Sequence, residues 1–258
     1  ADALSKGCRR FIMGIGGSAT NDAGTGMMEA LGYRFLDSEG NQLKGRGESL
    51  GRIKHIDASK AIEGLKDASF IVACDVDSPF CGPKGAAYVY GPQKGATSEM
   101  VKELDEGMQA FSRLIYKETG ADIMNIKGAG AAGGLGGALK AFLDADLKKG
   151  ADMVLDAIGF DQAIEDADLV ITGEGKIDSQ TLTGKLPYAV ARRASARNIP
   201  VMAICGRADV ESLPCFAHIC PVTPQEMSLE QAMQPDIAME NIKEKYLIPS
   251  HFLHLLLN

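Results

Sequence analysis

Residues 12–26 read IMGIGGSATNDAGTG, and glycine occupies five of these fifteen positions. Residues 8–15, which contain the apolar run 11–15, are typical of a β-strand that leads into the glycines, and residues 21–35 are predicted to form a helix capped by Asn21 or Asp22. A turn needs only one or two glycines. Because glycine lacks a Cβ atom, it lets another group come close to the main chain. The segment therefore indicates either a ligand on the backbone N–H groups or close packing of a helix on a strand.

The same arrangement occurs twice more in the chain. Residues 128–143 form a glycine-rich loop that leads into a helix, and residues 173–178 follow the apolar strand predicted at 168–172. Such loops place N–H groups at a helix N-terminus, where anions bind. One exposed contact of this kind contributes only ~0.3–1 kcal/mol, so several have to converge. Three polar glycine loops in one chain favour a phosphate ligand over packing alone.

The remaining periodicity predicts an α/β protein. Strands alternate with helices from about residue 150 onward, which favours a parallel sheet in that half. We therefore expect two domains, 1–155 and 156–258. A short strand-like segment, 86–90, lies within a long loop. The other predicted strands are 69–76 and 199–206, and the other predicted helices are 98–120, 186–198 and 228–246.

Composition narrows the function classes. The net charge of −7 argues against a nucleic-acid-binding protein, which normally carries a basic face. No apolar run approaches the ~20 residues that a membrane-spanning helix needs. The six cysteines include no CxxC pair and no zinc-ligand spacing, which favours reduced thiols in a cytoplasmic compartment.

Acidic and basic residues follow the predicted strands and loops. Asp75 ends one strand, and Glu174 and Asp178 follow another, at the strand ends where α/β proteins bind ligands and metals. Carboxylates hold Mg²⁺ in phosphoryl transfer, and an Asp often accepts the proton of the attacking hydroxyl. Lys94 and Lys185 are candidate phosphate contacts. Alternatively, Asp178 caps a helix and each lysine is a solvated surface residue.

A dinucleotide site is a further possibility. Gly128, Gly130 and Gly133 satisfy the GxGxxG pattern, and Asp152 follows at about the 20-residue spacing of a ribose-binding acid. However, residues 121–127 make only a weak strand ahead of the loop, and the Walker A and protein kinase motifs are absent. The residues alone thus predict an α/β protein that binds a phosphorylated ligand together with Mg²⁺.

Four segments resemble the glycerate kinase family of the bacterial, two-domain type. They occur in that family's order, and the resemblance covers roughly residues 1–240. Four long matches in order are far more specific than an isolated GxGxxG. The segments are 14–37, 72–96, 128–139 and 168–185.

The resemblance implies a fold and a reaction. Members of this family transfer the γ-phosphoryl group of ATP to D-glycerate with Mg²⁺, usually giving 2-phosphoglycerate, and we expect a cytoplasmic enzyme. The expected fold is a Rossmann-like parallel-sheet domain, incomplete here and including 156–258, with a second α/β domain inserted at 1–155. The matching residues imply catalytic roles for Asp75, Asp178 and Lys185, metal binding by Asp75 and Glu174, and ligand or cofactor binding by Gly14, Gly16, Gly17, Ser18, Asn21, Asp22, Gln93, Lys94, Gly128, Gly130, Gly133, Gly134 and Gly173.

Two departures from the family leave alternatives open. The family begins with a segment that carries D-S-F-K and A-D-G-G-E-G motifs, and this sequence contains neither. Without that segment, we expect an open sheet edge and an incomplete site wall. Residues 246–258 do not resemble the family's usual ending, and we expect a poorly ordered or non-native tail there, with a docked amphipathic segment as the alternative. The alternatives are an NAD-dependent dehydrogenase that uses the Gly128 loop, and a ligand-binding fragment without catalysis.

Overall fold

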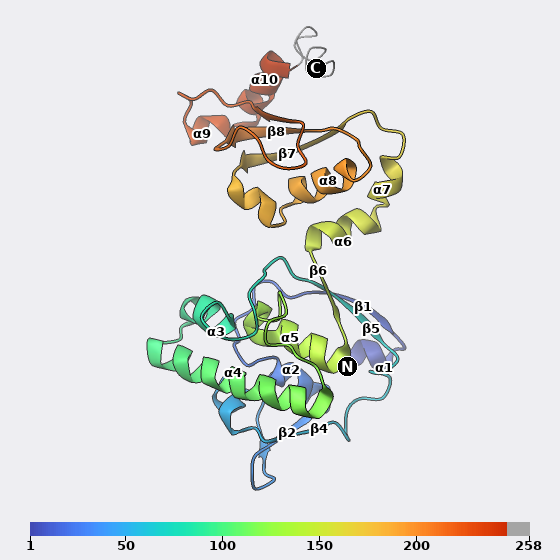
Figure 1. Cartoon of the computed structure of the whole chain (residues 1–258), viewed down its shortest axis with the longest axis vertical. Helices are drawn as coiled ribbons and strands as arrows, with labels where there is room; N and C mark the ends of the chain where they lie inside the picture. The colour runs from blue at the N-terminus through green and yellow to red at the C-terminus, as the bar shows by residue number, and fades with distance from the viewer. Residues whose placement is uncertain (247–258) are drawn as a thin grey trace. The chain divides into compact units, whose positions relative to one another are not determined.

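The computed structural model describes residues 1–246 and divides into two compact units, Ala1–Gly150 and Ala151–Asn258 (Figure 1). The boundary that we expect after residue 155 falls inside helix α6 (Gly150–Ala157). The identity of the units as an inserted domain and part of a Rossmann-like domain stays a prediction. The tail predicted at 246–258 lies outside the described residues from position 247 onward.

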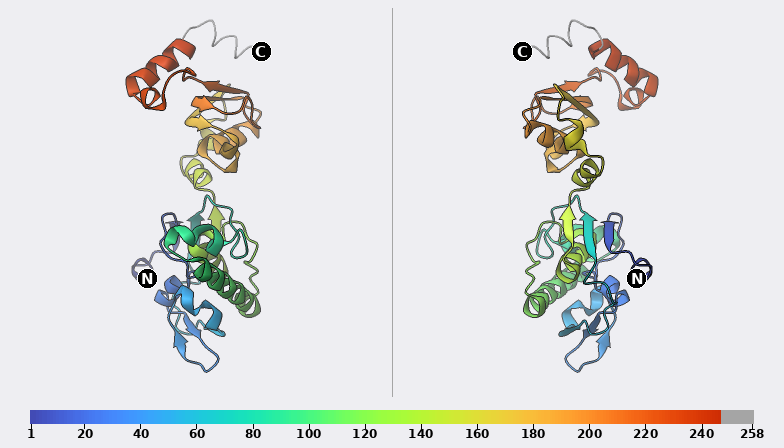
Figure 2. Two further views of the ribbon diagram at one scale, coloured as in Figure 1. Left: turned by 90° about the vertical axis from the view of Figure 1, so that its left-hand side faces the viewer. Right: turned by 90° about the vertical axis from the view of Figure 1, so that its right-hand side faces the viewer.

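The first unit contains a parallel sheet with the order β1-β5-β6. Its strands are β1 (Arg10–Gly14), β5 (Ser69–Ala73) and β6 (Asp146–Lys148), and the right-hand view of Figure 2 shows them side by side. β1 and β5 confirm the two strands predicted from apolar runs. Because β1 pairs with β5 from Arg10↔Ser69 to Gly14↔Ala73, both strands end at the same sheet edge. The short helix α1 (Asp2–Ser5) precedes β1.

The prediction of one helix over 21–35 is only partly right. Helix α2 covers Thr25–Ala30, and the chain then turns at Gly32, which has a φ of +91°. A Cβ atom at Gly32 would lie 2.0 Å from the Lys60 carbonyl oxygen, so the turn admits only glycine. Beyond it lie an antiparallel sheet with the order β3-β2-β4 and a 3₁₀ turn. Their bounds are β2 (Arg34–Leu36), β3 (Gln42–Leu43), η1 (Gly47–Arg52) and β4 (His55–Asp57).

The long helix α4 (Ser98–Thr119) confirms the periodic pattern at 98–120. The Thr97 hydroxyl caps its start by accepting a hydrogen bond from the Met100 N–H, and Gly120 ends it with a φ of +78°. Phe111 of α4 packs edge-on against Phe35 of β2, with ring centroids 5.7 Å apart, and both side chains are fully buried. This contact fixes the antiparallel sheet against the helix.

The strand predicted at 86–90 is wrong, because these residues form helix α3 (Ala86–Tyr90). Tyr and Val favour strands, but Ala86 and Ala87 are fully buried and let α3 approach α4 closely. The 3₁₀ turn η2 (Pro92–Lys94) follows. Helix α5 (Ala131–Leu143) lies beside α3 and α4, as Figures 1 and 2 show, and non-helical backbone at Ala132, Gly133 and Gly134 interrupts it.

The second unit contains a parallel sheet with the order β7-β8-β9, which confirms the predicted α/β pattern. The loop expected at 173–178 is instead mostly strand. Strand β7 (Val170–Ile177) continues through it because Gly173 lies so close to β8 that a Cβ atom would be 2.6 Å from the Ile204 carbonyl oxygen. The other elements are α7 (Phe160–Ala163), η3 (Ser179–Thr183), α8 (Leu186–Ser195), β8 (Val201–Ala208), β9 (His218–Pro221), α9 (Leu229–Ala232) and α10 (Pro235–Tyr246).

Candidate functional site

A cavity of about 380 Å³ opens in the first unit, where β1 and β5 end. Its volume lies within the range of small-molecule sites. Seven of the residues predicted for the site line it, together with Tyr90 and the start of α5. The predicted residues are Gly14, Gly16, Gly17, Ser18, Asp75, Gln93 and Lys94.

The first glycine loop presents bare backbone at this cavity. Cβ atoms built at Gly14, Gly16 and Gly17 would meet no heavy atom within 4 Å. Gly17 has a φ of +71°, which favours glycine. Packing therefore does not explain these three glycines, and they leave the main chain accessible to a ligand.

Lys94 provides a fixed positive charge at the same loop. Its Nζ donates hydrogen bonds to the Ser18 Oγ at 2.8 Å and to the Thr20 carbonyl oxygen at 2.6 Å. Burial lowers the pKa of Lys94 from its usual value, and the nearby charge of Asp22 opposes this shift. The ammonium is thus held in place, and partial desolvation strengthens its attraction for an anion.

The second glycine loop is packed rather than open. Cβ atoms at Gly130 and Gly133 would lie 2.2 Å and 2.1 Å from the carbonyl oxygens of Pro79 and Thr20. A Cβ atom at Gly128 would lie 2.8 Å from the Cys74 Sγ, and one at Gly134 would lie 2.7 Å from the Met108 Cε. The loop nevertheless meets the first one, because the Ala23 N–H donates to the Gly133 carbonyl oxygen at 2.9 Å. From this second loop, Ala131 and Ala132 line the 380 Å³ cavity.

Asn21 and Asp22 lie beside the first loop rather than in this cavity. The Asp22 carboxylate accepts hydrogen bonds from the N–H groups of Gly24 and Gly26, at 2.9 Å and 3.2 Å, but the capping position of α2 is Gly24 rather than Asn21 or Asp22 as predicted. Asn21 contributes to a second cavity of about 770 Å³, which Lys94 also lines. The two cavities therefore adjoin the same lysine.

Asp75 is exposed at the end of β5 and is hydrogen-bonded to the segment that follows β6. Its Oδ1 accepts from the Gly150 N–H at 2.7 Å. The Lys149 Nζ donates to the Asp75 carbonyl oxygen at 3.2 Å and to the Asp77 Oδ1 at 2.7 Å. These contacts fix the Asp75 carboxylate at the rim of the 380 Å³ cavity.

The second unit brings Glu174, Asp178 and Lys185 together. The Lys185 Nζ lies 3.8 Å from the Glu174 Oε2 and 3.5 Å from the Asp178 Oδ1. Asp178 also caps η3, as its alternative interpretation predicts, by accepting from the Gln180 N–H at 2.9 Å. Gly173 precedes this cluster on β7, and its glycine identity is explained by the approach of β8.

A family model described as the glycerate kinase family matches residues 1–246 of this chain. The chain belongs to the glycerate kinase family. The glycerate kinase of Bacillus subtilis (strain 168) is 46% identical over 236 residues, which cover 90% of this chain and 62% of that protein. The glycerate 2-kinase of Escherichia coli (strain K12) is 47% identical over 204 residues, covering 79% of this chain and 54% of that protein.

A solved structure also resembles this glycerate kinase family member. The structure named for glycerate kinase 2 of Salmonella typhimurium LT2 aligns with a TM-score of 0.77 and 40% identity, covering 98% of this chain and 67% of that one. The family resemblance and the α/β fold predicted from the sequence are therefore confirmed. The chain spans less than two thirds of the length of the Bacillus subtilis relative.

Sequence reasoning missed two residues of this family member's candidate site. Tyr90 lines the 380 Å³ cavity, and its hydroxyl lies 3.1 Å from the Ser78 Oγ. The strand-like composition of 86–90 concealed it, whereas in the structure Tyr90 belongs to helix α3 and lines the same cavity as Gln93 and Lys94. Thr181 is fully buried beside Glu174 and Asp178. Thr181 follows Asp178 at the three-residue spacing of a capping box, and this spacing in the sequence could have indicated Thr181.

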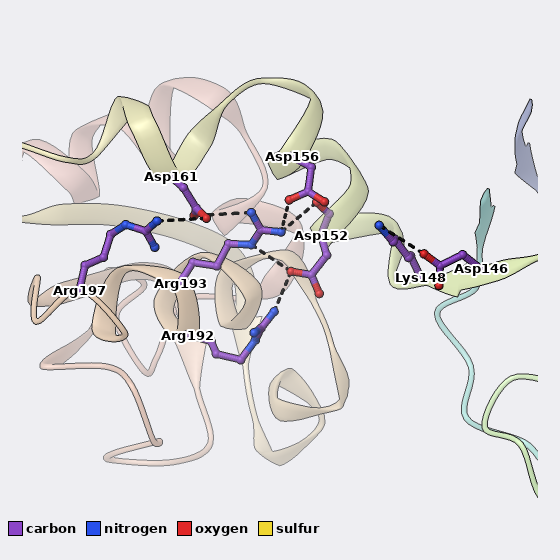
Figure 3. Close-up of polar contacts among 8 residues, drawn as sticks. All are labelled: Asp146, Lys148, Asp152, Asp156, Asp161, Arg192, Arg193 and Arg197. Carbon is purple, nitrogen blue, oxygen red and sulfur yellow. Dashed lines mark hydrogen bonds and ion pairs between the residues drawn. The ribbon is translucent and has the colours of Figure 1, made fainter. Parts of the chain in front are cut away.

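Asp152, the acid expected to bind a ribose, has other partners. Figure 3 shows it between the arginines of α8, and its Oδ1 accepts hydrogen bonds from Arg192 at 2.7 Å and Arg193 at 3.1 Å. Arg193 also pairs with Asp156 and Asp161. This network ties α6 and α7 to α8. Together with the packed glycines of the Gly128 loop, it removes the two observations on which the dinucleotide alternative depends.

The acids fit magnesium by their chemistry. Mg²⁺ is commonly held by one or two carboxylates plus phosphate and water oxygens. Glu174 and Asp178 offer such carboxylates beside Lys185, and Asp75 offers another at the cavity. Among residues 1–246, no group of three or more His, Cys, Asp or Glu side chains is arranged to hold a metal. The six cysteines all lie in this range and are unbridged.

No helix within residues 1–246 is both long enough and apolar enough to cross a membrane.

Proposed function

We propose that this glycerate kinase family member transfers the γ-phosphoryl group of ATP to the 2-hydroxyl of D-glycerate, giving 2-phosphoglycerate and ADP. The observation that carries the proposal is the 380 Å³ cavity, where the open Gly14–Gly17 backbone and the held Lys94 ammonium face the same space. Backbone amides and a lysine are the groups that bind phosphate and carboxylate oxygens in phosphoryl transfer. The family names of the relatives support the same reaction.

In the proposed mechanism, the residues of this chain position charged groups. The Gly14–Gly17 amides and Lys94 bind anionic oxygens of ATP or of the glycerate carboxylate, with Ser18 and Gln93 at the cavity wall. Asp75 or Asp178 accepts the proton of the 2-hydroxyl, and Lys185 stabilises negative charge on the phosphoryl group. Each unit supplies one candidate Mg²⁺ ligand, Asp75 in the first unit and Glu174 in the second, and bound Mg²⁺ would neutralise charge on phosphate oxygens. Most of the rate enhancement then comes from positioning and electrostatic stabilisation.

The cellular setting follows from the proposed chemistry. ATP is the phosphoryl donor, and the six unbridged cysteines suit a reducing compartment. We therefore place the enzyme in the cytoplasm, with D-glycerate as a small-molecule substrate and with neither nucleic acid nor membrane as a partner.

Product analysis by ³¹P NMR tests this function. The chain is incubated with ATP, MgCl₂ and D-glycerate, in parallel with the chain completed by the segment with which the family begins. We expect the phosphomonoester signal of 2-phosphoglycerate to appear with ADP in the completed protein. ADP without a glycerate phosphate, or 3-phosphoglycerate as the product, would contradict the proposal. Ligand-dependent stabilisation without any product in both proteins would support the binding-fragment alternative instead.

A further inference from the structure

Thr181 connects the two acids of the second unit through its hydroxyl. Thr181 lies in η3 and is fully buried. Its Oγ1 accepts a hydrogen bond from the Asp178 N–H at 3.2 Å and donates one to the Glu174 Oε1 at 2.9 Å. The hydroxyl therefore bonds both to the residue that caps η3 and to an acid seven positions earlier on β7.

The direction of these bonds is determined by the hydroxyl chemistry. A threonine hydroxyl has one proton to donate, and the Asp178 N–H can only donate to it. The single proton of Thr181 is thus directed to the Glu174 carboxylate. Hydrogen bonds to an ionised acceptor are stronger than neutral ones, so the carboxylate is held in one orientation. In this orientation its other oxygen, Oε2, lies 3.8 Å from the Lys185 Nζ.

Capping of η3 does not require the bond to Glu174. The Asp178 Oδ1 already accepts from the Gln180 N–H at 2.9 Å, and the Thr181 N–H donates to the Asp178 carbonyl oxygen at 3.0 Å. In a capping box the hydroxyl needs only to reach the N–H of the capping residue. The additional bond to Glu174 orients a group on a different element, which indicates a role at the site.

We propose that Thr181 is a positioning residue, whose hydroxyl holds the Glu174 carboxylate so that its second oxygen faces Lys185 and an incoming phosphate-bound divalent cation. This inference rests on the proposed function. Partners that orient a metal ligand typically contribute 10–100-fold to metal affinity or activity. The side chain of Thr181 itself touches neither substrate nor metal in this account.

The experiment compares Thr181→Val with Thr181→Ser. Both variants are made in this 258-residue chain and in the chain joined to the segment with which the family begins. Valine keeps the shape and removes the hydroxyl, whereas serine keeps the hydroxyl. Two readouts are used: Mn²⁺ binding in the presence of ADP, followed by electron paramagnetic resonance, and glycerate-dependent turnover. We expect Thr181→Val to weaken Mn²⁺ binding and to lower kcat by about tenfold or more, with little change in the KM for glycerate. Thr181→Ser should restore both to near wild type.

A Glu174→Gln background separates positioning from folding. If Thr181 acts through the Glu174 carboxylate, Thr181→Val should add little to the loss caused by Glu174→Gln. Equal fold-losses in both backgrounds would overturn the inference, as would unchanged Mn²⁺ binding in Thr181→Val. If no glycerate phosphate forms in any protein, the proposed function fails, while the Mn²⁺–ADP measurement still decides the role of Thr181.

A second variant covers the case in which Thr181→Val does not fold. Thr181→Cys retains a side chain of similar size with a much weaker donor. The inference then predicts Mn²⁺ binding that is clearly weaker for Thr181→Cys than for Thr181→Ser. Equal binding by the two variants would overturn it.

Discussion

The Nζ of Lys94 lies 2.8 Å from the Oγ of Ser18, although 76 residues separate the two in the sequence. The bond joins η2 to the open glycine loop after β1, at the place where both line the 380 Å³ cavity. A lysine side chain is flexible, so its ammonium needs acceptors to stay at one position. Ser18 and the Thr20 carbonyl oxygen supply them.

Removing the Ser18 hydroxyl should therefore weaken ligand binding more than folding. In Ser18→Ala, Lys94 keeps the Thr20 carbonyl oxygen as an acceptor but loses one restraint. We expect the KM for ATP or for glycerate to rise several-fold, while the free energy of unfolding changes by about 1 kcal/mol or less. Steady-state kinetics and urea unfolding measure the two effects. An unchanged KM for both substrates would contradict this role of Ser18.

The depressed pKa of Lys94 predicts how pH affects the protein. Burial lowers this pKa in the folded state, so between the lowered value and the usual value near 10.4 the unfolded chain binds more protons. Lys94 thus makes a contribution to the free energy of unfolding that rises with pH across that window. Ligand binding falls over the same window as the ammonium is lost. Lys94→Arg should move the alkaline loss of binding to higher pH, and an unmoved profile would contradict the assignment.

Two glycines with nearly the same backbone conformation should respond differently to alanine. Gly17 has a φ of +71° and Gly133 a φ of +70°, so both substitutions carry a strain of about 1–2 kcal/mol. Only at Gly133 would the Cβ also meet a backbone oxygen, 2.1 Å away at Thr20. We expect Gly133→Ala to lower the midpoint of thermal unfolding clearly more than Gly17→Ala. Gly17→Ala should instead impair nucleotide binding, and equal stability losses would contradict this distinction.

The arginine network of α8 predicts a difference between neighbouring arginines. The Arg193 side chain is 13% exposed and pairs with Asp152, Asp156 and Asp161, whereas that of Arg197 is 40% exposed and pairs with Asp161. Removing Arg193 breaks the ion pair of Asp156 and takes one of two arginines from Asp152 and from Asp161, so we expect Arg193→Ala to cost about 1.5–3 kcal/mol of unfolding free energy. Arg197→Ala should cost about 0.5 kcal/mol or less. Chemical unfolding monitored for the second unit measures both, and similar values would contradict the network's role.

The sequence predicted the fold where local and tertiary preferences agree. The apolar period of 98–120 gives α4, and the apolar runs give β1, β5, β7 and β8. It failed where tertiary packing overrides local preference. Residues 86–90 contain the strand-favouring Tyr88, Val89 and Tyr90, yet the two buried alanines bring them against α4 as a helix. The run 173–177 is rich in glycine, yet pairing with β8 keeps it a strand.

The candidate site was predictable in its residue types but not in the role of each glycine. Composition alone does not show whether Gly14 or Gly130 is needed for ligand access or for close packing. In the structure, a Cβ at Gly14 would meet nothing within 4 Å, whereas at Gly130 it would meet a carbonyl oxygen at 2.2 Å. This difference depends on which distant backbone passes by, here that of Pro79, and no local pattern encodes it. Thr181 was missed for a related reason, since its bond to Glu174 depends on how η3 folds back on β7.

Glycerate-dependent release of ADP by a Lys94→Met variant tests the central claim most directly. The control is Lys84→Met, which removes an exposed lysine ten positions earlier in the family segment 72–96. We predict that the completed protein releases ADP only with D-glycerate, that Lys94→Met lowers kcat/KM by about 100-fold, and that Lys84→Met retains wild-type activity. Equal ADP release by Lys94→Met and wild type, in proteins that unfold at the same temperature, would contradict the account.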